Sequence, residues 1–550
     1  MKKIILYSAA IAALFACNKI DEEVIPVNSE GKQIITAYAS IPFTKLAYSE
    51  NTVGGGNGLS STWETGDTFK AIQKTGDDVT VVTFTLYDGN GTTQGKFRTE
   101  TEGVTAETQW TAVLGSHSTI SSEEIHCSYK GQNGKLASLD DYNYVVSSGT
   151  GTAPTFSFNP GTAKSYIMRI KLPAGIKCIE YTPSAYWKVS TSEVKRQYYS
   201  FTNPQNGDAS NSVYTYAAFE AANTSTIELD AASASGDIIY LAVPAINYDY
   251  TSGGTVFNAK QYCNIYNGVI VTLMNDVSDE ATLSCGAVLG SDVSTKGGQI
   301  GTFDMSGKTL LHRPKPADAI RFQTASNSFL DSGRSFNSKT DTYWSPFNVG
   351  ASSEAEVGNY YSWGEIEPKA TYSEATYSRW HDPDGDATNV LDAISFKFTP
   401  WGGDGASSLY SIAGSRYDAA RVQWGVAWRM CSVLEMMALS KHTRAYQTIS
   451  GMPGTKVTVS GGSDYLFIPQ SNIMINSTLS RYPGKSVDWS TFWTSDNVNR
   501  IDVSATPIIQ PYMYGEKGDV DYWNNKNTVR FWWGEPVRPV LASSTIEQAS

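Results

Sequence analysis

The chain has 550 residues, a net charge of −12 at neutral pH and an aromatic content of 12%. This length is sufficient for about three or four domains of ordinary size. The acidic balance provides no basic surface to neutralise phosphates, which argues against a nucleic-acid partner.

The first 17 residues have the pattern of a bacterial secretion signal. Lys2 and Lys3 precede an apolar run over residues 4–15, and this run is shorter than the roughly 20 residues that span a bilayer. It ends at Ala16 and Cys17, and a small residue before a cysteine at this place resembles the lipobox of bacterial lipoproteins. The resemblance implies that Cys17 carries a lipid that anchors a surface protein in the outer membrane. An ordinary signal peptide followed by a chance cysteine is the alternative.

Residues 18–32 are polar and include Asp21, Glu22 and Glu23. A segment of this composition, next to a membrane anchor, is predicted to be a flexible tether and not part of a core.

The following segment has the patterns of a β-sheet protein. Residues 34–41 and 79–86 are strand-like, and residues 87–91 (YDGNG) carry a turn signal. Glycine (47 residues) and tyrosine (32 residues) are abundant, and long helical repeats are scarce, which favours strands and turns. We therefore predict a β-sandwich over residues 33–162.

A second β-sandwich is predicted over residues 163–310. Residues 166–172 alternate between apolar and polar side chains, and residues 238–244 (IIYLAVP) have the apolar character of a buried strand.

Three motifs in this half of the chain accompany the lipobox. An early strand leads to Thr44 and Lys45, WETGD stands at residues 63–67, and YLAVPA stands at residues 240–245. Together they resemble the fimbrillin family of bacterial pilus subunits over residues 17–310. The resemblance implies two transthyretin-like β-sandwiches in tandem, with other fimbrillin subunits as partners.

Membership of that family would also imply assembly by strand exchange. A protease would cut after a basic residue, here Lys45, so that Leu46 becomes the N-terminus. The released segment would leave a groove for a strand from a neighbouring subunit, because a sheet edge with unpaired backbone groups accepts a strand readily. Arg98 is a less suitable cleavage site, since several strands precede it.

Tryptophan marks the start of a different domain. Of the 14 tryptophans, three precede residue 317 and eleven follow it. Residues 311–316 contain two prolines, which favour an extended, stiff linker.

Residues 317–550 carry six motifs whose order and spacing resemble the Fibrobacter succinogenes major paralogous domain. These motifs lie at residues 343–351, 358–369, 425–430, 466–469, 492–495 and 537–540. The resemblance implies an α+β, divergent C-type-lectin-like fold, although Cys431 stands where the family usually has proline. The expected fold class is therefore mainly β: two tandem transthyretin-like β-sandwiches followed by an α+β C-type-lectin-like domain.

Local patterns support an ordered C-terminal domain without the family. Ser432 and Glu435 have the spacing of a capping box that opens a helix. Trp428 and Met430 are more suited to the core than to a ligand site. Arg538 lies in an apolar run, where it needs a carboxylate or a carbonyl as partner, and a structural salt bridge is the favoured interpretation.

Five cysteines remain once Cys17 is assigned to lipid, so at least one is unpaired within the chain. They are Cys127, Cys178, Cys263, Cys285 and Cys431. No CxxC motif is present, which argues against structural zinc. Most of them are expected to be buried thiols, and a bridge between Cys263 and Cys285 is left open.

The sequence predicts no enzyme. Its five histidines have no metal-ligand spacing, and no Gly-x-Ser-x-Gly motif occurs. Formylglycine-generating enzymes are similar in fold to C-type lectins and use a pair of cysteines, whereas this domain has only Cys431. A carbohydrate-active hydrolase with unrecognised carboxylates remains an alternative.

Two features of the C-terminal domain are candidates for ligand binding. Asp382, Asp384 and Asp386 alternate along one loop, an arrangement that suits calcium, with a solvated acidic turn as the alternative. A second set of residues combines aromatic rings, which can stack on sugars, with amides, which can bond hydroxyls; a packed aromatic rim is the alternative. This set is Trp493, Trp523, Asn524 and Asn525.

These patterns lead to one functional hypothesis and one main rival. The hypothesis is a fimbrial subunit that acts as a tip adhesin, with the lectin-like domain meeting host or bacterial glycans or proteins. In the fimbrillins that this chain resembles, a donor strand follows the second sandwich. In this chain a further domain follows it instead, so a position at the tip is expected. The rival is a surface lipoprotein that binds glycans and does not polymerise.

Overall fold

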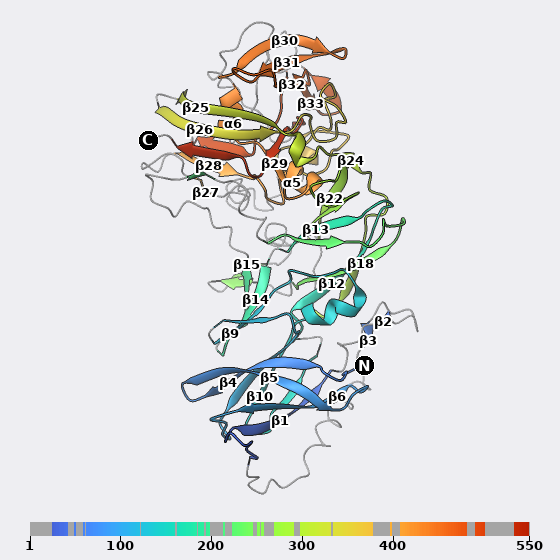
Figure 1. The fold of residues 1–550 in the computed structure, drawn as a ribbon, viewed down its shortest axis with the longest axis vertical. Helices are drawn as coiled ribbons and strands as arrows, with labels where there is room; N and C mark the ends of the chain where they lie inside the picture. The colour runs from blue at the N-terminus through green and yellow to red at the C-terminus, as the bar shows by residue number, and fades with distance from the viewer. Residues whose placement is uncertain are drawn as a thin grey trace.

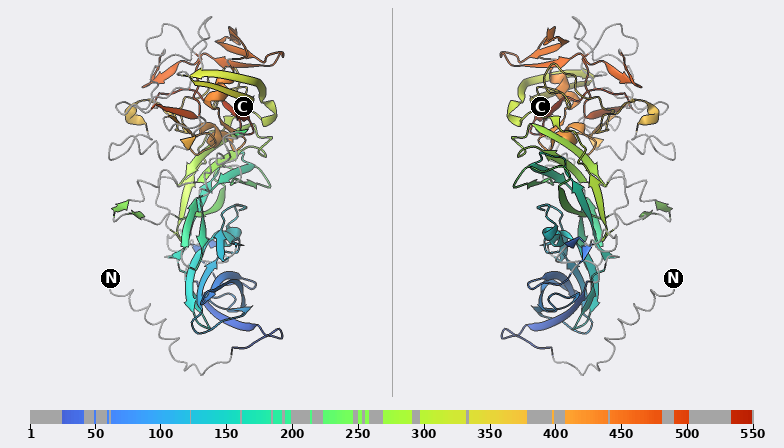
Figure 2. Two further views of the ribbon diagram at one scale, coloured as in Figure 1. Left: turned by 90° about the vertical axis from the view of Figure 1, so that its left-hand side faces the viewer. Right: turned by 90° about the vertical axis from the view of Figure 1, so that its right-hand side faces the viewer.

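A computed structural model describes the chain at residues 25–41, 49–50, 59–60, 62–121, 123–159, 162–183, 185–191, 194–198, 213–214, 223–245, 250–252, 255–257, 269–290, 297–331, 334–377, 397–398, 407–439, 441–480, 490–500 and 533–548. β-Sheets follow one another along the long axis of the molecule, from the N-terminal strands at one end to the C-terminal domain at the other (Figure 1, Figure 2). Strands dominate the described elements, which confirms the mainly β fold class.

The first β-domain is a seven-stranded sheet with the strand order β10-β7-β4-β5-β6-β1-β11. The sheet curls so that its two edges meet, and Ser157 N donates a hydrogen bond from β11 to Ser147 Oγ of β10 at 2.9 Å. Its strands are β1 (Gln33–Ser40), β4 (Thr68–Thr75), β5 (Asp78–Asp88), β6 (Gln94–Thr101), β7 (Gln109–Leu114), β10 (Val145–Thr150) and β11 (Thr155–Ser157), with a small ribbon of β2 (Ser49–Glu50) and β3 (Leu59–Ser60).

The curled sheet encloses an aromatic core. Along β6, buried and exposed residues alternate strictly, as the two-residue period of a half-buried strand requires. Phe69 stacks on Phe84 with ring centroids 5.1 Å apart, and Phe97 packs edge-on against Trp63 at 4.7 Å. Such ring pairs add stability beyond the apolar area that they bury.

Part of the predicted tether is ordered. Val27 forms a β-bridge with Gln33, and Ile34 N donates to Pro26 O at 2.6 Å. Ile25 packs against the aromatic core. The prediction of a flexible tether over residues 18–32 is therefore wrong for residues 25–32, because this stretch pairs with β1 and buries an apolar side chain.

The second β-domain has two sheets on one core. The three-stranded sheet has the order β18-β12-β23 and contains β12 (Ser165–Lys171), β18 (Ile238–Pro244) and β23 (Ile300–Asp304). The five-stranded sheet has the order β17-β13-β21-β22-β24 and contains β13 (Cys178–Thr182), β17 (Ser225–Glu228), β21 (Val269–Met274), β22 (Leu283–Leu289) and β24 (Leu311–His312). The short strands β19 (Tyr250–Ser252) and β20 (Thr255–Phe257) pair with each other.

The two β-domains place their first strands in the same way. β1 is antiparallel to β6 on one side and parallel to β11 on the other, and β12 is antiparallel to β18 and parallel to β23. In both cases the parallel partner is a late strand of the same domain. This shared pattern is what tandem copies of one topology would produce.

A shared sheet and a shared core join the two β-domains. The four-stranded sheet β15-β14-β9-β8 takes β8 (Thr119–Ser121) and β9 (Glu124–Cys127) from the first, and β14 (Ala185–Val189) and β15 (Val194–Tyr198) from the second. A cluster of buried residues that includes Ile72, Val113, Ile167 and Tyr240 spans both domains. The 3-10 helix η1 (Leu136–Tyr142) contributes Leu139 to this cluster.

In its described residues, the C-terminal domain combines small sheets with two short helices. Its main sheet has the order β16-β37-β26-β36-β29, with β25 paired to β26. The strands are β16 (Val213–Tyr214), β25 (Ile320–Asp331), β26 (Arg334–Trp344), β27 (Lys397–Phe398), β28 (Ser407–Ser411), β29 (Trp428–Met430), β30 (Thr443–Ile449), β31 (Met452–Thr458), β32 (Tyr465–Pro469), β33 (Ile473–Ile475), β34 (Thr478–Ser480), β35 (Asp496–Arg500), β36 (Pro539–Leu541) and β37 (Thr545–Gln548). The helices are α5 (Ala419–Trp424) and α6 (Val433–Leu439), and the 3-10 turns are η3 (Pro316–Asp318) and η4 (Glu374–Thr376).

Helix α5 lies against the outer face of the five-stranded sheet and joins the second β-domain to the C-terminal domain (Figure 1). Thr272 Oγ1 donates to Val422 O at 2.9 Å, and Ser284 Oγ donates to Gln423 O at 2.7 Å. Gly286 sits under the helix, where an added Cβ would lie 1.8 Å from Val422 O. Because a glycine permits this close approach, the helix backbone rests directly on the sheet.

The segment predicted as a stiff linker is built into this junction. Leu311 and His312 form β24 and pair with β22. The buried Arg313 donates to Trp424 O at 2.6 Å and to Ala281 O at 2.9 Å. Residues 311–316 are therefore not a free linker, because β22 offers a sheet edge to β24 and two carbonyls hold the Arg313 guanidinium.

Candidate functional site

Strand β1 is held by hydrogen-bonded neighbours on both sides. Its register with β6 runs from Gln33 opposite Thr101 to Ser40 opposite Gln94. On the other side, Phe158 N donates to Ser40 O at 2.9 Å. β1 therefore closes the sheet between β6 and β11, and its removal would expose the pairing edges of both strands.

The inner face of β1 belongs to the core of the first β-domain. Ile35, Ala37 and Ala39 are buried, as is Ile41 just after the strand. The outer face is open to solvent at Tyr38, which is 37% exposed. The strand thus contributes one apolar stripe to the core and leaves its other face free.

The residues predicted for anchoring and maturation lie outside the described residues. These are Cys17 for lipidation, and Lys45 and Leu46 for proteolysis. The structure describes the chain up to Ile41 and again from Ser49. The predicted cleavage site therefore falls between β1 and β2, and their ends are the nearest described positions.

Strand β37 is paired on both sides within its own molecule. Thr340 of β26 lies opposite Ile546, and Val213 of β16 lies opposite Glu547. Strand β16 comes from the segment between β15 and β17 of the second β-domain, so that β-domain contributes a strand to the C-terminal sheet.

Trp493 does not face a ligand. Its side chain is fully buried, and its Nε1 donates to Tyr361 O at 2.6 Å. Its backbone forms a parallel bridge with Val537. The prediction that Trp493 stacks on sugars is therefore wrong, because its side chain is a fully buried member of the hydrophobic core of the C-terminal domain.

The other predicted ligand residues cannot be placed by the structure. The calcium candidates Asp382, Asp384 and Asp386 lie outside the described residues. The same holds for the glycan candidates Trp523, Asn524 and Asn525. Across the described ranges, no three His, Cys, Asp or Glu side chains converge in a way that could hold a metal ion.

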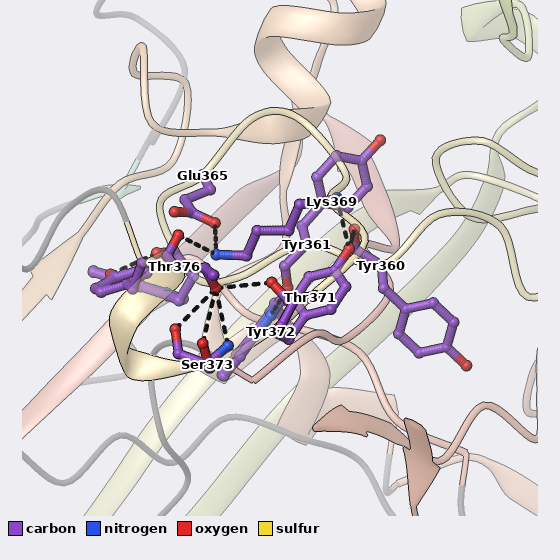
Figure 3. A network of polar contacts seen from close by, with 11 residues as sticks. Tyr360, Tyr361, Glu365, Lys369, Thr371, Tyr372, Ser373 and Thr376 are labelled. Carbon is purple, nitrogen blue, oxygen red and sulfur yellow. Dashed lines mark hydrogen bonds and ion pairs between the residues drawn. The ribbon is translucent and has the colours of Figure 1, made fainter. Parts of the chain in front are cut away.

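A polar network fixes the loop over residues 360–376, beside the aromatic core of the C-terminal domain (Figure 3). Lys369 Nζ forms an ion pair with Glu365 Oε2 at 2.6 Å and donates to Thr376 O at 3.0 Å. The same ammonium group lies 5.5 Å from the ring centroid of Tyr372 and 5.7 Å from that of Tyr377. A cation between aromatic faces is favourable when it is partly desolvated.

The backbone and hydroxyl groups of this loop are also engaged with one another. Lys369 N donates to Tyr372 Oη at 3.1 Å, and Tyr372 Oη donates to Tyr360 O at 2.5 Å. Thr371 Oγ1 and Ser477 Oγ lie 2.9 Å apart and link the loop to the β33–β34 hairpin. Since these groups satisfy one another, the network acts as a scaffold for the loop.

Glu535 is a buried carboxyl group without a charged partner among the residues that the structure describes. Its side chain is fully buried, and neither carboxyl oxygen has a hydrogen-bond partner within the structure as described. Its backbone pairs with Tyr361, in both directions, at 2.9 and 3.0 Å. Burial alone raises the pKa of Glu535 well above the ordinary carboxyl value, because water is excluded from the charged form.

The predicted capping box of α6 is confirmed. Ser432 N donates to Glu435 Oε2 at 2.7 Å, and Glu435 N donates back to Ser432 Oγ at 3.2 Å. Arg429, also buried, forms a two-bond pair with the Glu435 carboxylate at 2.7 and 2.8 Å. Breaking such a buried pair from one side typically costs 3–5 kcal/mol.

Of the other structural predictions for this domain, the burial of Trp428 and Met430 is confirmed and the salt bridge of Arg538 is wrong. Trp428 and Met430 are buried in the core. Arg538 is fully buried and donates to Asn348 Oδ1 at 2.6 Å, Phe467 O at 2.9 Å and Ser345 O at 3.1 Å. Its partners are thus neutral oxygen atoms instead of the carboxylate that a salt bridge requires.

The described cysteines are buried thiols, as expected. Cys285 is a free thiol, and Cys263, the other cysteine of the bridge that was left open, lies outside the described residues. Burial raises the pKa of the Cys178 thiol and of the Cys285 thiol to about 12. Thiols of this kind are poor nucleophiles at neutral pH.

Sequence analysis did not identify one buried acid at the junction between the second β-domain and the C-terminal domain. Glu180 of β13 is buried at the junction, where it accepts hydrogen bonds from Val426 N at 2.8 Å and Ser278 Oγ at 2.6 Å. In sequence it is a single acid within the apolar strand CIEYT. That interruption was the available signal, but it does not say which segment covers the residue.

Within the ranges that the structure describes, no helix is both long and apolar enough to cross a membrane. The predicted signal segment lies outside those ranges.

Comparison with protein-family models finds no match for this chain, and comparison with curated proteins finds none either. Two solved structures align with part of it. One is a putative cell adhesion protein from Bacteroides ovatus, 10% identical over 52% of this chain and 96% of that chain, with a TM-score of 0.27. The other is a leucine-rich repeat protein from Bacteroides thetaiotaomicron, 8% identical over 50% of this chain and 26% of that chain, with a TM-score of 0.13. Scores this low establish neither a shared fold nor a family, so function is argued from the geometry of the chain itself.

Proposed function

We propose that this protein is a surface adhesin subunit that joins a fimbrium by strand exchange at β1. The observation that carries the proposal is the setting of β1, which lies between β6 and β11 and fills the core with one face only. Releasing it would open a groove with two unpaired edges and an apolar floor. A strand from another fimbrial subunit is the occupant that such a groove fits.

The sequence supports a proposal for how the precursor is anchored and how β1 is released. Cys17 is proposed to carry the lipid that holds the precursor in the outer membrane. Cleavage after Lys45 would remove the lipid and β1 in one step, because β1 ends at Ser40. This coupling makes a groove available only on molecules that have also lost the anchor.

We place the subunit at the tip of the fimbrium. Strand β37 supports this position because it is paired with both β26 and β16, so it would have to leave its own sheet to be donated. The C-terminal domain lies at the opposite end of the molecule from the first β-domain (Figure 2). An adhesin bound through its first β-domain would therefore present that domain outward, toward glycans or proteins.

Two measurements test this function. Mass spectrometry of purified fimbriae is expected to find this protein with Leu46 at its N-terminus, and immunogold against residues 317–550 is expected to mark fimbrial tips. A matched Lys45→Ala variant should stay full-length and absent from fimbriae. Recovery of only uncleaved protein on the cell envelope would favour the non-polymerising, glycan-binding lipoprotein.

The anchor has its own test. Metabolic labelling with a palmitate analogue should mark the Lys45→Ala protein, which retains its N-terminal segment, and substitution of Cys17 by alanine should abolish the label. Label that persists without Cys17 would reject the anchor while leaving strand exchange open.

A further inference from the structure

We infer that the groove under β1 selects its partner by size: small residues at the centre of the strand and branched aliphatic residues at its ends. The pattern is that of β1 itself, Ile35-x-Ala37-x-Ala39-x-Ile41. The inference rests on the proposed function, since it names the kind of subunit strand that the groove takes. It concerns only four inward positions: Ile35, Ala37 and Ala39 of the eight-residue strand β1, and Ile41 directly after it.

The centre of the groove is filled from below by aromatic rings. Ala37 lies opposite Phe97 of β6, and Ala39 lies next to Phe156 of β11. The ring of Phe69 packs between them, 4.8 Å from Phe97 and 5.3 Å from Phe156 between centroids. The neighbouring rings thus supply the bulk, and β1 supplies methyl groups.

Gly95 shows how little space remains there. It lies opposite Ala39, and a Cβ added to it would come within 2.7 Å of the Phe97 ring and 3.0 Å of the Trp63 ring. Contacts under 3.0 Å require a neighbour to shift, and close-packed interiors resist added volume. A strand with a large side chain at either central position would therefore displace these rings.

The ends of the groove differ from the centre. Ile35 lies opposite Thr99, a much smaller side chain than Phe97, and is fully buried there. Ile41 is also fully buried, and its backbone N donates to Thr93 O at 3.0 Å. Each branched side chain at these two positions fills space that an alanine would leave empty.

The outward-facing residues of β1 do not limit the size of the partner's side chains. Tyr38 is 37% exposed, and Thr36 and Ser40 are half-buried. Selection is therefore expected to read alternate residues of the partner, as the two-residue period of a strand dictates.

The chain's own last strand does not fit this pattern. β37 spans only Thr545–Gln548, and Ile546 is its one aliphatic residue, so it cannot supply aliphatic side chains at both ends of the groove. The inference thus assigns the groove to a strand of a different subunit and not to β37 of another copy.

The test uses the full chain with a specific protease site inserted between Ile41 and Ser49. After nicking, β1 remains bound without a covalent link, and its exchange for a fluorescent peptide of residues 33–41 can be followed. Peptides with Ala37→Leu or Ala39→Leu are expected to bind about tenfold more weakly or worse. The reason is that the free energy lost by overpacking a core is comparable to that of a tenfold change in affinity. The matched control peptide, with Thr36→Leu on the outward side, is expected to bind within about twofold of the original.

Equal binding of the Ala37→Leu, Ala39→Leu and original peptides would overturn the inference, and so would a nicked protein that takes up none of them. Failure of the proposed function would look different. In that case the nicked protein still discriminates among peptides, whereas fimbriae contain no protein cleaved after Lys45. As a second readout, Ala37→Leu in the intact chain should lower the Tm, and Thr36→Leu should not.

Discussion

Strands β1 and β12 occupy the same topological position in the two β-domains but have opposite surroundings. β1 buries alternate residues and leaves Tyr38 37% exposed. β12 buries both faces: Ile170 points into its own core, and Ile167, only 4% exposed, packs into the cluster shared with the first β-domain. The same place in a fold can therefore hold a strand with one exposed face in one domain and a strand buried on both faces in the next.

The outer faces of the two sheets repeat the contrast. In the first β-domain, Lys96 and Asp88 form an exposed ion pair at 2.8 Å. In the second, Glu180 and Gly286 lie beneath α5. The first β-domain thus has an outer face with exposed charges, while α5 covers the corresponding face of the second.

The largest expected effect is at the junction with α5. Gly286→Ala would place a methyl group 1.8 Å from Val422 O. We expect the free energy of unfolding to fall by about 3 kcal/mol or more, because either the helix backbone or the strand backbone must move to relieve this contact. Gly307→Ala is the matched control, since nothing lies within 4 Å of its added Cβ. Thermal unfolding would measure both, and equal Tm values would refute the fixed junction.

A slightly smaller effect is expected for the outward residue of β12. Ile167→Ala should cost about 2–4 kcal/mol, because it leaves a cavity in the shared cluster. The corresponding change on β1, Tyr38→Ala, should stay within about 0.5 kcal/mol, as is usual at exposed sites. Chemical denaturation of both variants tests the contrast, which disappears if the two losses are similar.

The buried acid of the second β-domain should matter more than an exposed acid of the first. Glu180→Ala leaves Val426 N without its acceptor, and a buried, unsatisfied donor costs about 1–3 kcal/mol. Asp88→Ala should cause no measurable change, because its partner Lys96 remains in water. Denaturant midpoints measure both variants, and an equal loss of stability in Asp88→Ala would contradict this expectation.

The smallest expected effect is a pH dependence confined to the C-terminal domain. Because the pKa of Glu535 is raised in the folded state, the folded protein keeps a proton that the unfolded chain loses. The free energy of unfolding should therefore fall as pH rises from about 4.5, the ordinary carboxyl pKa, through the higher folded value. Glu535→Gln should flatten this part of the curve, and an unchanged pH profile of Tm would contradict the assignment.

Local patterns predicted a large part of the fold. The strand at residues 34–41 corresponds to β1, and the strand at residues 238–244 coincides with β18. The capping box of α6 was equally predictable, since Ser432 and Glu435 are three residues apart. Strand alternation and helix capping depend on neighbours in sequence, so they can be read without a tertiary structure.

The candidate site was less predictable. The apolar stripe of β1 can be read directly from the sequence, but the rings that fill the space beneath its alanines come from four other strands or loops. Trp493 and Trp428 look alike in sequence as tryptophans of a Trp-rich domain. Both proved to be core residues, because burial of a single aromatic side chain depends on what packs over it.

The sequence by itself determined that the chain is mainly β, where many of its strands run, and where a capped helix begins, because these depend on the period and spacing of nearby residues. Only the tertiary structure decided which sheet faces meet water. Thr272 and Ser284 have side chains suited to solvent, yet they bond carbonyls of α5 that lie 150 and 139 residues further along the chain. No local pattern encodes a contact at that separation, since it arises from packing of one completed element on another.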